Sequence, residues 1–181
     1  MAPLQSAWQP RLEGTLLRLR PVTREDFERL HAVGSDPEVW AVHPASDRWK
    51  DEVFGAYFEE GLASGGALVA VEQATGRIIG WSRYMTEYAG PGEIEVGATF
   101  LGRPWWGGAY NGEMKRLMLA HAFRHVDRVI LRIGETNGRS RRAAEKIGAR
   151  LQVGRRGPEP LPGAVHLFYA VEKADFEADQ A

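Results

Sequence analysis

Residues 103–113 read Arg-Pro-Trp-Trp-Gly-Gly-Ala-Tyr-Asn-Gly-Glu, and they join a predicted strand at 94–101 to a predicted helix at 111–125. Small residues in such a loop let a ligand come close to the backbone. The first turn of a helix also carries unpaired N–H groups and about half a positive charge. The segment therefore predicts an anion site, most often one for phosphate. A tight turn that only packs the helix on the strand is the alternative interpretation.

A second informative segment, residues 137–149, follows a predicted strand at 129–133 and reads Asn-Gly-Arg-Ser-Arg-Arg-Ala-Ala-Glu-Lys-Ile-Gly-Ala. Asn137 is a suitable N-cap for a helix at 138–147, and Gly148 is a suitable residue to end it. Capping explains the two ends of this string but not its interior.

The rest of the chain alternates between strands and helices. Hydrophobic spacing and turn residues predict the order β-α-α-β-β-β-α-β-α-β-β. The remaining predicted strands are 16–20, 68–72, 78–84, 151–155 and 165–171, and the remaining predicted helices are 23–34 and 48–63. This order predicts an α/β (α+β) fold, in which a mixed sheet has helices on both faces.

Length and composition exclude several classes of protein. The 181 residues fit one domain spanning 1–181, with loose ends expected at about 1–10 and 173–181. A net charge of −1 argues against a protein dedicated to nucleic-acid or membrane binding. The absence of cysteine excludes disulfides and thiolate metal sites and fits a cytoplasmic location. No membrane span or secretory signal is apparent, and the five histidines have no metal-ligand spacing, so we expect no metal.

The two segments together resemble the GNAT superfamily of acetyl-CoA-dependent N-acetyltransferases, more narrowly its ribosomal-protein alanine N-acetyltransferase-like branch. The resemblance rests on Trp-Gly-Gly-Ala-Tyr-Asn-Gly-Glu at 106–113, the Asn137-x-x-Ser140 pair and Glu-Lys-x-Gly-Ala at 145–149, and it extends from about residue 16 to 171. It implies a mixed, mostly antiparallel sheet of seven strands, splayed between the fourth and the fifth.

The resemblance also implies which residues hold the cofactor. Backbone amides of the loop would bind the pyrophosphate of acetyl-CoA, the end of the fourth strand and Asn137 would contact its pantetheine arm, and Ser140 would lie near the thioester sulfur. The implied cofactor residues are Phe100, Leu101, Trp106, Gly107, Gly108, Ala109, Tyr110, Asn111, Gly112, Asn137 and Ser140. Pro104 departs from the family pattern ahead of the loop. Ala143 and Ala144 replace a tyrosine that often serves as general acid, which gives more weight to Ser140.

Glu95 is the first choice for the base. It lies in the middle of the predicted strand 94–101, on the face opposite Ile94 and Val96, and a partly buried carboxylate there should have a raised pKa. A solvated or ion-paired glutamate is the alternative interpretation. Glu93 or a water molecule are the other candidates for the base.

These observations predict an N-acetyltransferase that transfers an acetyl group to a primary amine by direct attack on the thioester. The acceptor stays open between a protein N-terminus and a small molecule, such as a polyamine or an aminoglycoside. A catalytically silent CoA-binding module and a domain without cofactor are the rival hypotheses. We expect no nucleic-acid or membrane partner, and a monomer or a homodimer. The resemblance implies that segments 40–49 and 154–163 flank the acceptor, and the aromatic candidates for that side are Trp40, His43, Trp49, Trp81 and Tyr84.

Overall fold

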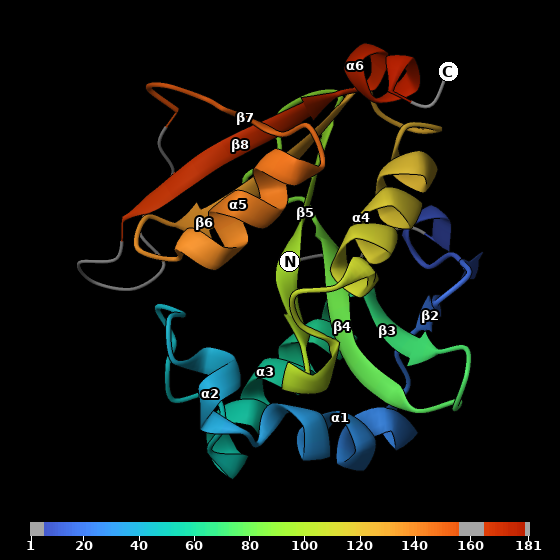
Figure 1. Ribbon diagram of the computed structural model, residues 1–181, viewed down its shortest axis with the longest axis vertical. Coiled ribbons are helices and arrows are strands. Elements are labelled where there is room, and N and C mark those ends of the chain that lie inside the picture. The colour runs from blue at the N-terminus through green and yellow to red at the C-terminus, as the bar shows by residue number, and fades with distance from the viewer. Residues whose placement is uncertain (1–5, 156–164, 180–181) are drawn as a thin grey trace.

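One sheet of eight strands organises the protein in the computed structural model, which describes residues 6–155 and 165–179 (Figure 1). The strands lie in the order β1-β2-β3-β4-β5-β6-β8-β7. They are β1 (Leu12–Glu13), β2 (Leu17–Pro21), β3 (Ala67–Glu72), β4 (Ile78–Met85), β5 (Glu93–Leu101), β6 (Arg128–Gly134), β7 (Arg150–Leu151) and β8 (His166–Glu172). The predicted mixed α/β fold is confirmed, and the one strand beyond the predicted seven is the two-residue β1.

Helices cover both faces of the sheet. They are α1 (Phe27–Gly34), α2 (Pro37–Trp40), α3 (Asp51–Ser64), α4 (Ala109–Ala122), α5 (Gly138–Lys146) and α6 (Lys173–Ala178). One core joins α1, α2 and α3 to one face through residues such as Leu30, Phe54 and Trp81. The other core joins α4 and α5 to the opposite face, with Met118 and Ala144 among its buried residues. Burial of these two apolar layers drives the arrangement seen in Figure 1.

The strands β5 and β6 form the single parallel pair in the described sheet, and they pair only briefly. Three residue pairs join them, from Glu93 and Arg128 to Glu95 and Ile130. Beyond that point β5 continues to Leu101 and β6 to Gly134 without pairing to each other. The predicted splay between these strands is therefore confirmed, and Figure 1 shows them diverging.

A bulge in β5 lies at the start of the splay. Between the pairs Trp81–Phe100 and Arg83–Gly97, β5 contains one residue more than β4, and Ala98 takes a left-handed φ of 46°. The Tyr57 hydroxyl donates to the Ala98 carbonyl at 2.7 Å and accepts from the indole N–H of Trp81 at 2.8 Å. This buried pair of hydrogen bonds fixes the bulge from the α3 side.

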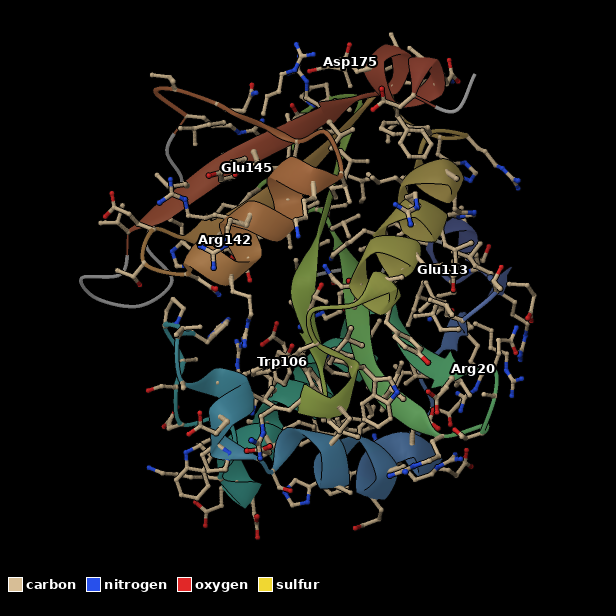
Figure 2. All side chains as sticks on the ribbon, viewed as in Figure 1. Arg20, Trp106, Glu113, Arg142, Glu145 and Asp175 are labelled. Carbon is tan, nitrogen blue, oxygen red and sulfur yellow. The ribbon has the colours of Figure 1, made fainter. Side chains whose placement is uncertain are left out.

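Helix α4 is tied to the start of the sheet by a carboxylate. Glu113 accepts hydrogen bonds from the backbone N–H groups of Thr15, Leu16 and Leu17 at 2.8–2.9 Å. Figure 2 shows Glu113 directed from α4 toward this N-terminal segment. The last residue of the 106–113 motif therefore has a structural role.

Both expected loose ends contain ordered structure. Residues 173–178, expected to be irregular, form α6, because Phe176 packs on Phe123 with ring centroids 5.2 Å apart. Near the N-terminus, Trp8 packs on Tyr84 at 4.9 Å. The strand predicted at 151–155 is shorter and lies at Arg150–Leu151. Of the segment 154–163 that the resemblance places beside the acceptor, residues 156–163 lie outside the described residues. None of the described helices is long and apolar enough to cross a membrane.

Replacing Tyr57 tests the bulge. Tyr57→Phe leaves two buried groups, the Trp81 N–H and the Ala98 carbonyl, without their hydroxyl partner. We expect a loss of about 1–3 kcal/mol in the free energy of unfolding, measured by chemical denaturation. Tyr84→Phe is the matched comparison, since the hydroxyl of Tyr84 serves only the Met118 carbonyl, and it should cost less. Equal losses would contradict a special role for Tyr57.

Candidate functional site

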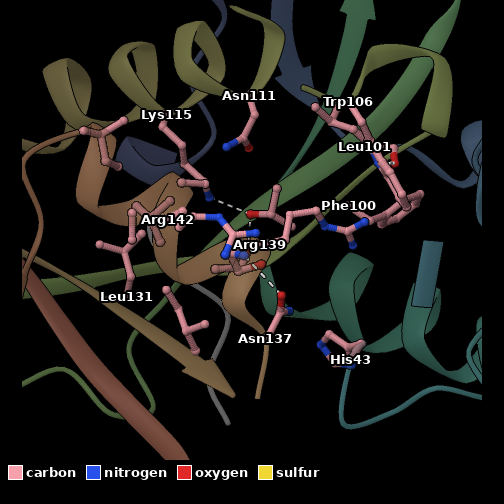
Figure 3. Close-up of a pocket in the computed structure, with 18 of the residues that line it drawn as sticks. His43, Phe100, Leu101, Trp106, Asn111, Lys115, Leu131, Asn137, Arg139 and Arg142 are labelled. Atoms are coloured by element: carbon pink, nitrogen blue, oxygen red, sulfur yellow. Dashed lines mark hydrogen bonds between the residues drawn. The ribbon is translucent and has the colours of Figure 1, made fainter. Parts of the chain in front are cut away.

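A cavity of about 510 Å³ opens where β5 and β6 diverge (Figure 3). Its walls are the end of β5, the loop before α4, the first two turns of α4, the end of β6 and the inner side of α5. At one end it reaches α2 and the segment that follows, including Trp40 and His43. The size is typical of small-molecule sites.

The glycine loop presents its backbone to this cavity. Gly107 has a φ of 69°, a left-handed conformation that favours glycine, and a Cβ added to Gly108 would meet no atom within 4 Å. Helix α4 begins directly after Gly108, so its first amides have no partner within the helix. The open space beside these amides fits the predicted anion site.

Aromatic side chains hold the loop from both sides. The indole N–H of Trp106 donates to the Leu101 carbonyl at 2.7 Å. The Trp105 indole and the Tyr110 hydroxyl both donate to Glu72 on β3, at 2.9 and 2.7 Å. The amides of Trp105 and Trp106 donate to the Gly102 and Arg103 carbonyls at 3.0 Å, whereas the amides from Gly107 to Asn111 remain available for a ligand.

The structure brings most of the predicted cofactor residues together. The cavity is lined by Phe100, Leu101, Trp106, Gly107, Gly108, Ala109, Asn111, Gly112, Asn137 and Ser140. Tyr110 is not part of the lining, because its hydroxyl is held by Glu72. Glu95 is not part of it either, although its neighbours Val96 and Gly97 are. Of the aromatic candidates, Trp40 and His43 line the cavity, Trp81 and Tyr84 lie in the cores, and Trp49 is exposed.

Asn137 begins α5 as its N-cap. Its side-chain oxygen accepts the amide of Ser140 at 3.1 Å. With that oxygen engaged, the amide nitrogen of this buried side chain is the group that could donate to a ligand. Capping and ligand binding therefore use different atoms of one residue.

The cavity lining is strongly cationic. Six basic side chains line it: Lys115, Arg116, Arg132, Arg139, Arg142 and Lys146. No aspartate or glutamate of the described residues lines it. In the described ranges, no group of three or more possible metal-ligating side chains lies together. The site is therefore built for an anionic ligand.

Sequence reasoning missed Lys115, Arg116 and Arg132 as parts of the site. Helical spacing could have found the first two, because residues four apart from Asn111 and Gly112 lie on the same face of α4. Arg132 carries no such signal, since it becomes part of the site only where β6 leaves β5.

Arg139 spans the cavity between its walls. Its guanidinium lies 3.7 Å from the ring centroid of Trp106, and one of its nitrogens donates to the Val39 carbonyl at 3.4 Å. It thereby connects the start of α5 to the loop before α4 and to α2.

Two buried ionisable groups stand on either side of β5. Glu95 is 1% exposed, one of its oxygens lies 3.4 Å from Arg132, and the other has no hydrogen-bond partner. Burial raises the pKa of the Glu95 carboxyl above its usual range. Lys115 reaches from α4 to Thr99 and Ser82, at 2.6 and 3.2 Å, and burial lowers its pKa to about 7.

The other titratable candidates are less suited to take up a proton at neutral pH. Glu93 bonds Arg155 at 2.7 Å and Arg128 at 3.3 Å, and the Arg155 contact above all lowers its pKa to about 2. His43, at the α2 end of the cavity, has its pKa lowered to about 3 by burial and by nearby Arg48.

Comparison with known proteins agrees with this architecture. Residues 17–150 match the family model described as an acetyltransferase (GNAT) domain. A GCN5-related N-acetyltransferase from Brucella melitensis is 20% identical and superimposes with a TM-score of 0.82, over 94% of this chain and 81% of that one. A protein of T. thermophilus assigned as an acetyltransferase is 27% identical, with a TM-score of 0.70 over 93% and 92% of the two chains.

A third similar structure is Mycobacterium smegmatis RimJ in complex with CoA-disulfide. It is 18% identical and superimposes with a TM-score of 0.71, over 93% of this chain and 90% of that chain. At this identity the likeness shows a shared fold, and the ribosomal-protein branch stays a prediction.

Asn137→Asp separates the two uses of that side chain. Aspartate caps a helix as well as asparagine does. The free energy of unfolding should therefore stay within roughly a few tenths of a kcal/mol of the wild-type value. The substitution removes the amide donor and adds a negative charge, and we expect binding of acetyl-CoA to weaken about tenfold, measured by calorimetry. Unchanged affinity would restrict Asn137 to capping.

Proposed function

The chain belongs to the GNAT acetyltransferase family, and from that premise we propose that it transfers the acetyl group of acetyl-CoA to a primary amine by direct attack on the thioester. The observation that carries the proposal is the cation-lined cavity at the start of α4. CoA carries a pyrophosphate and a further phosphate, so a lining of six basic side chains without a carboxylate matches its charge.

The described residues offer a fitting partner for each part of acetyl-CoA. The free amides at 107–111 suit the pyrophosphate, and Arg116, Arg142 and Lys146 supply charge around it. The pantetheine arm is a chain of amides. Because β5 leaves β6 after Glu95, the backbone edge from Val96 to Leu101 is not paired with β6 and can bond those amides.

We assign the uptake of the amine proton to Glu95 and a hydrogen bond to the leaving sulfur to Ser140. The raised pKa of Glu95 suits a group that takes a proton from an ammonium ion near neutral pH. Since Glu95 lies just behind the lining, we assign the transfer to a water molecule between it and the amine. Ser140 lines the cavity on α5 and supplies a hydroxyl for the departing sulfur.

The charge of the site also favours some acceptors over others. Trp40, His43 and Arg132 line the end of the cavity near α2, and no described acidic side chain lines it. Polyamines and aminoglycosides carry several positive charges and need acidic sites. We therefore favour an acceptor with a single amine, such as a protein N-terminus, over these two classes. The ribosomal-protein substrate, the cytoplasmic location and the monomeric or dimeric state stay predictions.

An acceptor screen tests the proposed function. The protein is incubated with acetyl-CoA and a peptide with a free N-terminus, a polyamine or an aminoglycoside. Release of the CoA thiol and acetylation of the amine, seen by mass spectrometry, support the proposal. Binding of acetyl-CoA with no amine acetylated would replace it with the silent CoA-binding module.

Acetyl-CoA should stabilise the fold through the glycine loop. At a concentration a hundredfold above Kd, binding to the native state alone adds about 2.7 kcal/mol. Gly108→Val places a branched side chain in the open space beside the loop, and we expect the thermal shift to disappear. Gly55→Val is the control, because its Cβ also meets no atom within 4 Å but lies on α3. A full thermal shift in Gly108→Val would refute the loop assignment.

Glu95→Gln tests the base. A base must be ionised, so the wild-type kcat/KM should rise with pH through the raised pKa of Glu95. The variant should lose about 10²-fold or more in kcat/KM at neutral pH. It should recover partly at higher pH, where more of the acceptor amine is already neutral. Glu93→Gln, outside the cavity, should keep the wild-type profile. A wild-type rate and profile in Glu95→Gln would exclude this residue.

A further inference from the structure

Lys115 is a buried basic side chain to which the proposed function assigns no chemical step, only a share in the charge of the lining. It lies on α4, six residues after the helix begins, and its side chain points into the cavity (Figure 3). It is 6% exposed and donates to the hydroxyls of Thr99 and Ser82. No carboxylate of the described residues forms an ion pair with it. A buried amine without an acidic partner is costly to keep charged.

The groups around Lys115 determine the protonation state of its amine. The hydroxyls of Thr99 on β5 and Ser82 on β4 accept its hydrogen bonds, and the two hydroxyl oxygens lie 2.7 Å from each other. The charged groups around the same cavity are Arg116 on α4, Arg132 on β6, and Arg139, Arg142 and Lys146 on α5, with Glu95 behind β5. Two titratable imidazoles also line it, His43 after α2 and His166 at the start of β8. Burial sets the pKa of Lys115 at about 7, and the charge of Glu95 acts in the opposite direction. Lys115 can therefore give and regain a proton near neutral pH.

The helix opposite Lys115 offers no such group. The α5 residues that line the cavity are Asn137 at its cap, Ser140, Ala143, Ala144 and three basic side chains. A serine hydroxyl can donate a hydrogen bond, but it has no proton that dissociates near neutral pH. Arginine likewise keeps its proton, and the one lysine of this wall, Lys146, is the last residue of α5, six residues beyond Ser140. Within the described lining, the α5 wall has no good source for a proton that must end on sulfur.

We propose that Lys115 is the group that protonates the sulfur of CoA as the acetyl group leaves, a role that rests on the proposed acetyl transfer. In this step the amine nitrogen bonds to the acetyl carbon, and the carbon–sulfur bond breaks with its electron pair moving to sulfur. One Nζ proton passes to sulfur, and Lys115 becomes a neutral amine that keeps Thr99 and Ser82 as neighbours. The acceptor enters this step as a neutral amine, because Glu95 has already taken the proton of its ammonium form through water, and the second proton that its nitrogen loses on forming the amide goes to solvent. Ser140 holds the sulfur by a hydrogen bond, and solvent restores the proton of Lys115 after the CoA thiol departs.

Substitutions of Lys115 test the proposal through kinetics. Lys115→Met keeps the length of the side chain, removes the proton and leaves the contact between Thr99 and Ser82. We expect kcat to fall by about 10²-fold, near the low end for a positioned acid because a thiolate leaves readily, with the KM for acetyl-CoA unchanged. The wild-type kcat should decline as the pH rises through about 7 and Lys115 loses its proton, and Lys115→Met should lack this decline. Lys115→Arg keeps the charge but cannot release a proton, so it should also be slow and lack the decline. Lys50→Met, an exposed lysine outside the cavity, is the control and should behave as wild type.

A second measurement needs no acetyl transfer. The ultraviolet absorbance of bound CoA reports ionisation of its thiol. A thiolate beside Lys115 would keep the amine protonated above its own pKa of about 7, and the ammonium in turn stabilises the thiolate, so part of the bound CoA should ionise at a lower pH than free CoA. This early ionisation, a shift to lower pH, should vanish in Lys115→Met and remain in Lys50→Met. If wild type shows no shift, or Lys115→Met keeps it, the proposal is overturned and Lys115 only supports the β5 bulge through Thr99 and Ser82. If wild type shows the shift but acetylates no amine, the contact stands and the proposed function fails.

Discussion

The brevity of the β5–β6 pairing is the constraint on which the site depends. These strands run parallel over three residue pairs and then separate, while β5 continues six residues past Glu95. An unpaired strand edge in the middle of a sheet would leave backbone groups unsatisfied. The bulge at Ala98, held by Tyr57 on one side and by Thr99 and Ser82 on the other, turns this edge toward the cavity. Binding groups on α4 and α5 face each other only because the strands diverge.

Desolvation acts on both sides of β5 with opposite effects. It raises the pKa of Glu95 and lowers that of Lys115, because each charged form is penalised by burial. An acid and an amine are thereby brought toward neutral pH from opposite directions. This arrangement suits a reaction in which one proton leaves an amine and another reaches a sulfur. The cationic lining carries the charge that the phosphates of the proposed cofactor, CoA, would need.

The sequence predicts the parts of the fold that depend on local chemistry. The glycine loop, the cap at Asn137 and the alternation of strands and helices are visible in residue spacing, and the splay follows from the family resemblance. The 106–113 motif does not reveal the separate roles of its members. Glu113 ties α4 to β2, and Tyr110 turns to Glu72, because partners distant in sequence decide where these side chains lie.

Long-range packing explains what sequence reasoning missed. Lys115 looks like an ordinary helical lysine until β5 supplies Thr99 and β4 supplies Ser82. Arg132 becomes part of the site only at the end of β6. The polar segment at 173–178 forms a helix because Phe176 packs on Phe123 at the C-terminal end of α4. Helical spacing can place Lys115 on the face of α4 that carries Asn111, but no local pattern in the chain reveals its partners, the position of Arg132 or the contact of Phe176.

Hydrogen exchange of the backbone amides with and without acetyl-CoA tests the central claim most directly. Acetyl-CoA in the cavity between β5 and β6 should protect amides at 97–101, at 107–112 and at the start of α5. Amides of α1 and α6, outside the cavity, should exchange at the same rate in both states. Protection confined to those three segments is the result that the account predicts. Absence of protection there, or protection only elsewhere in the protein, would contradict it.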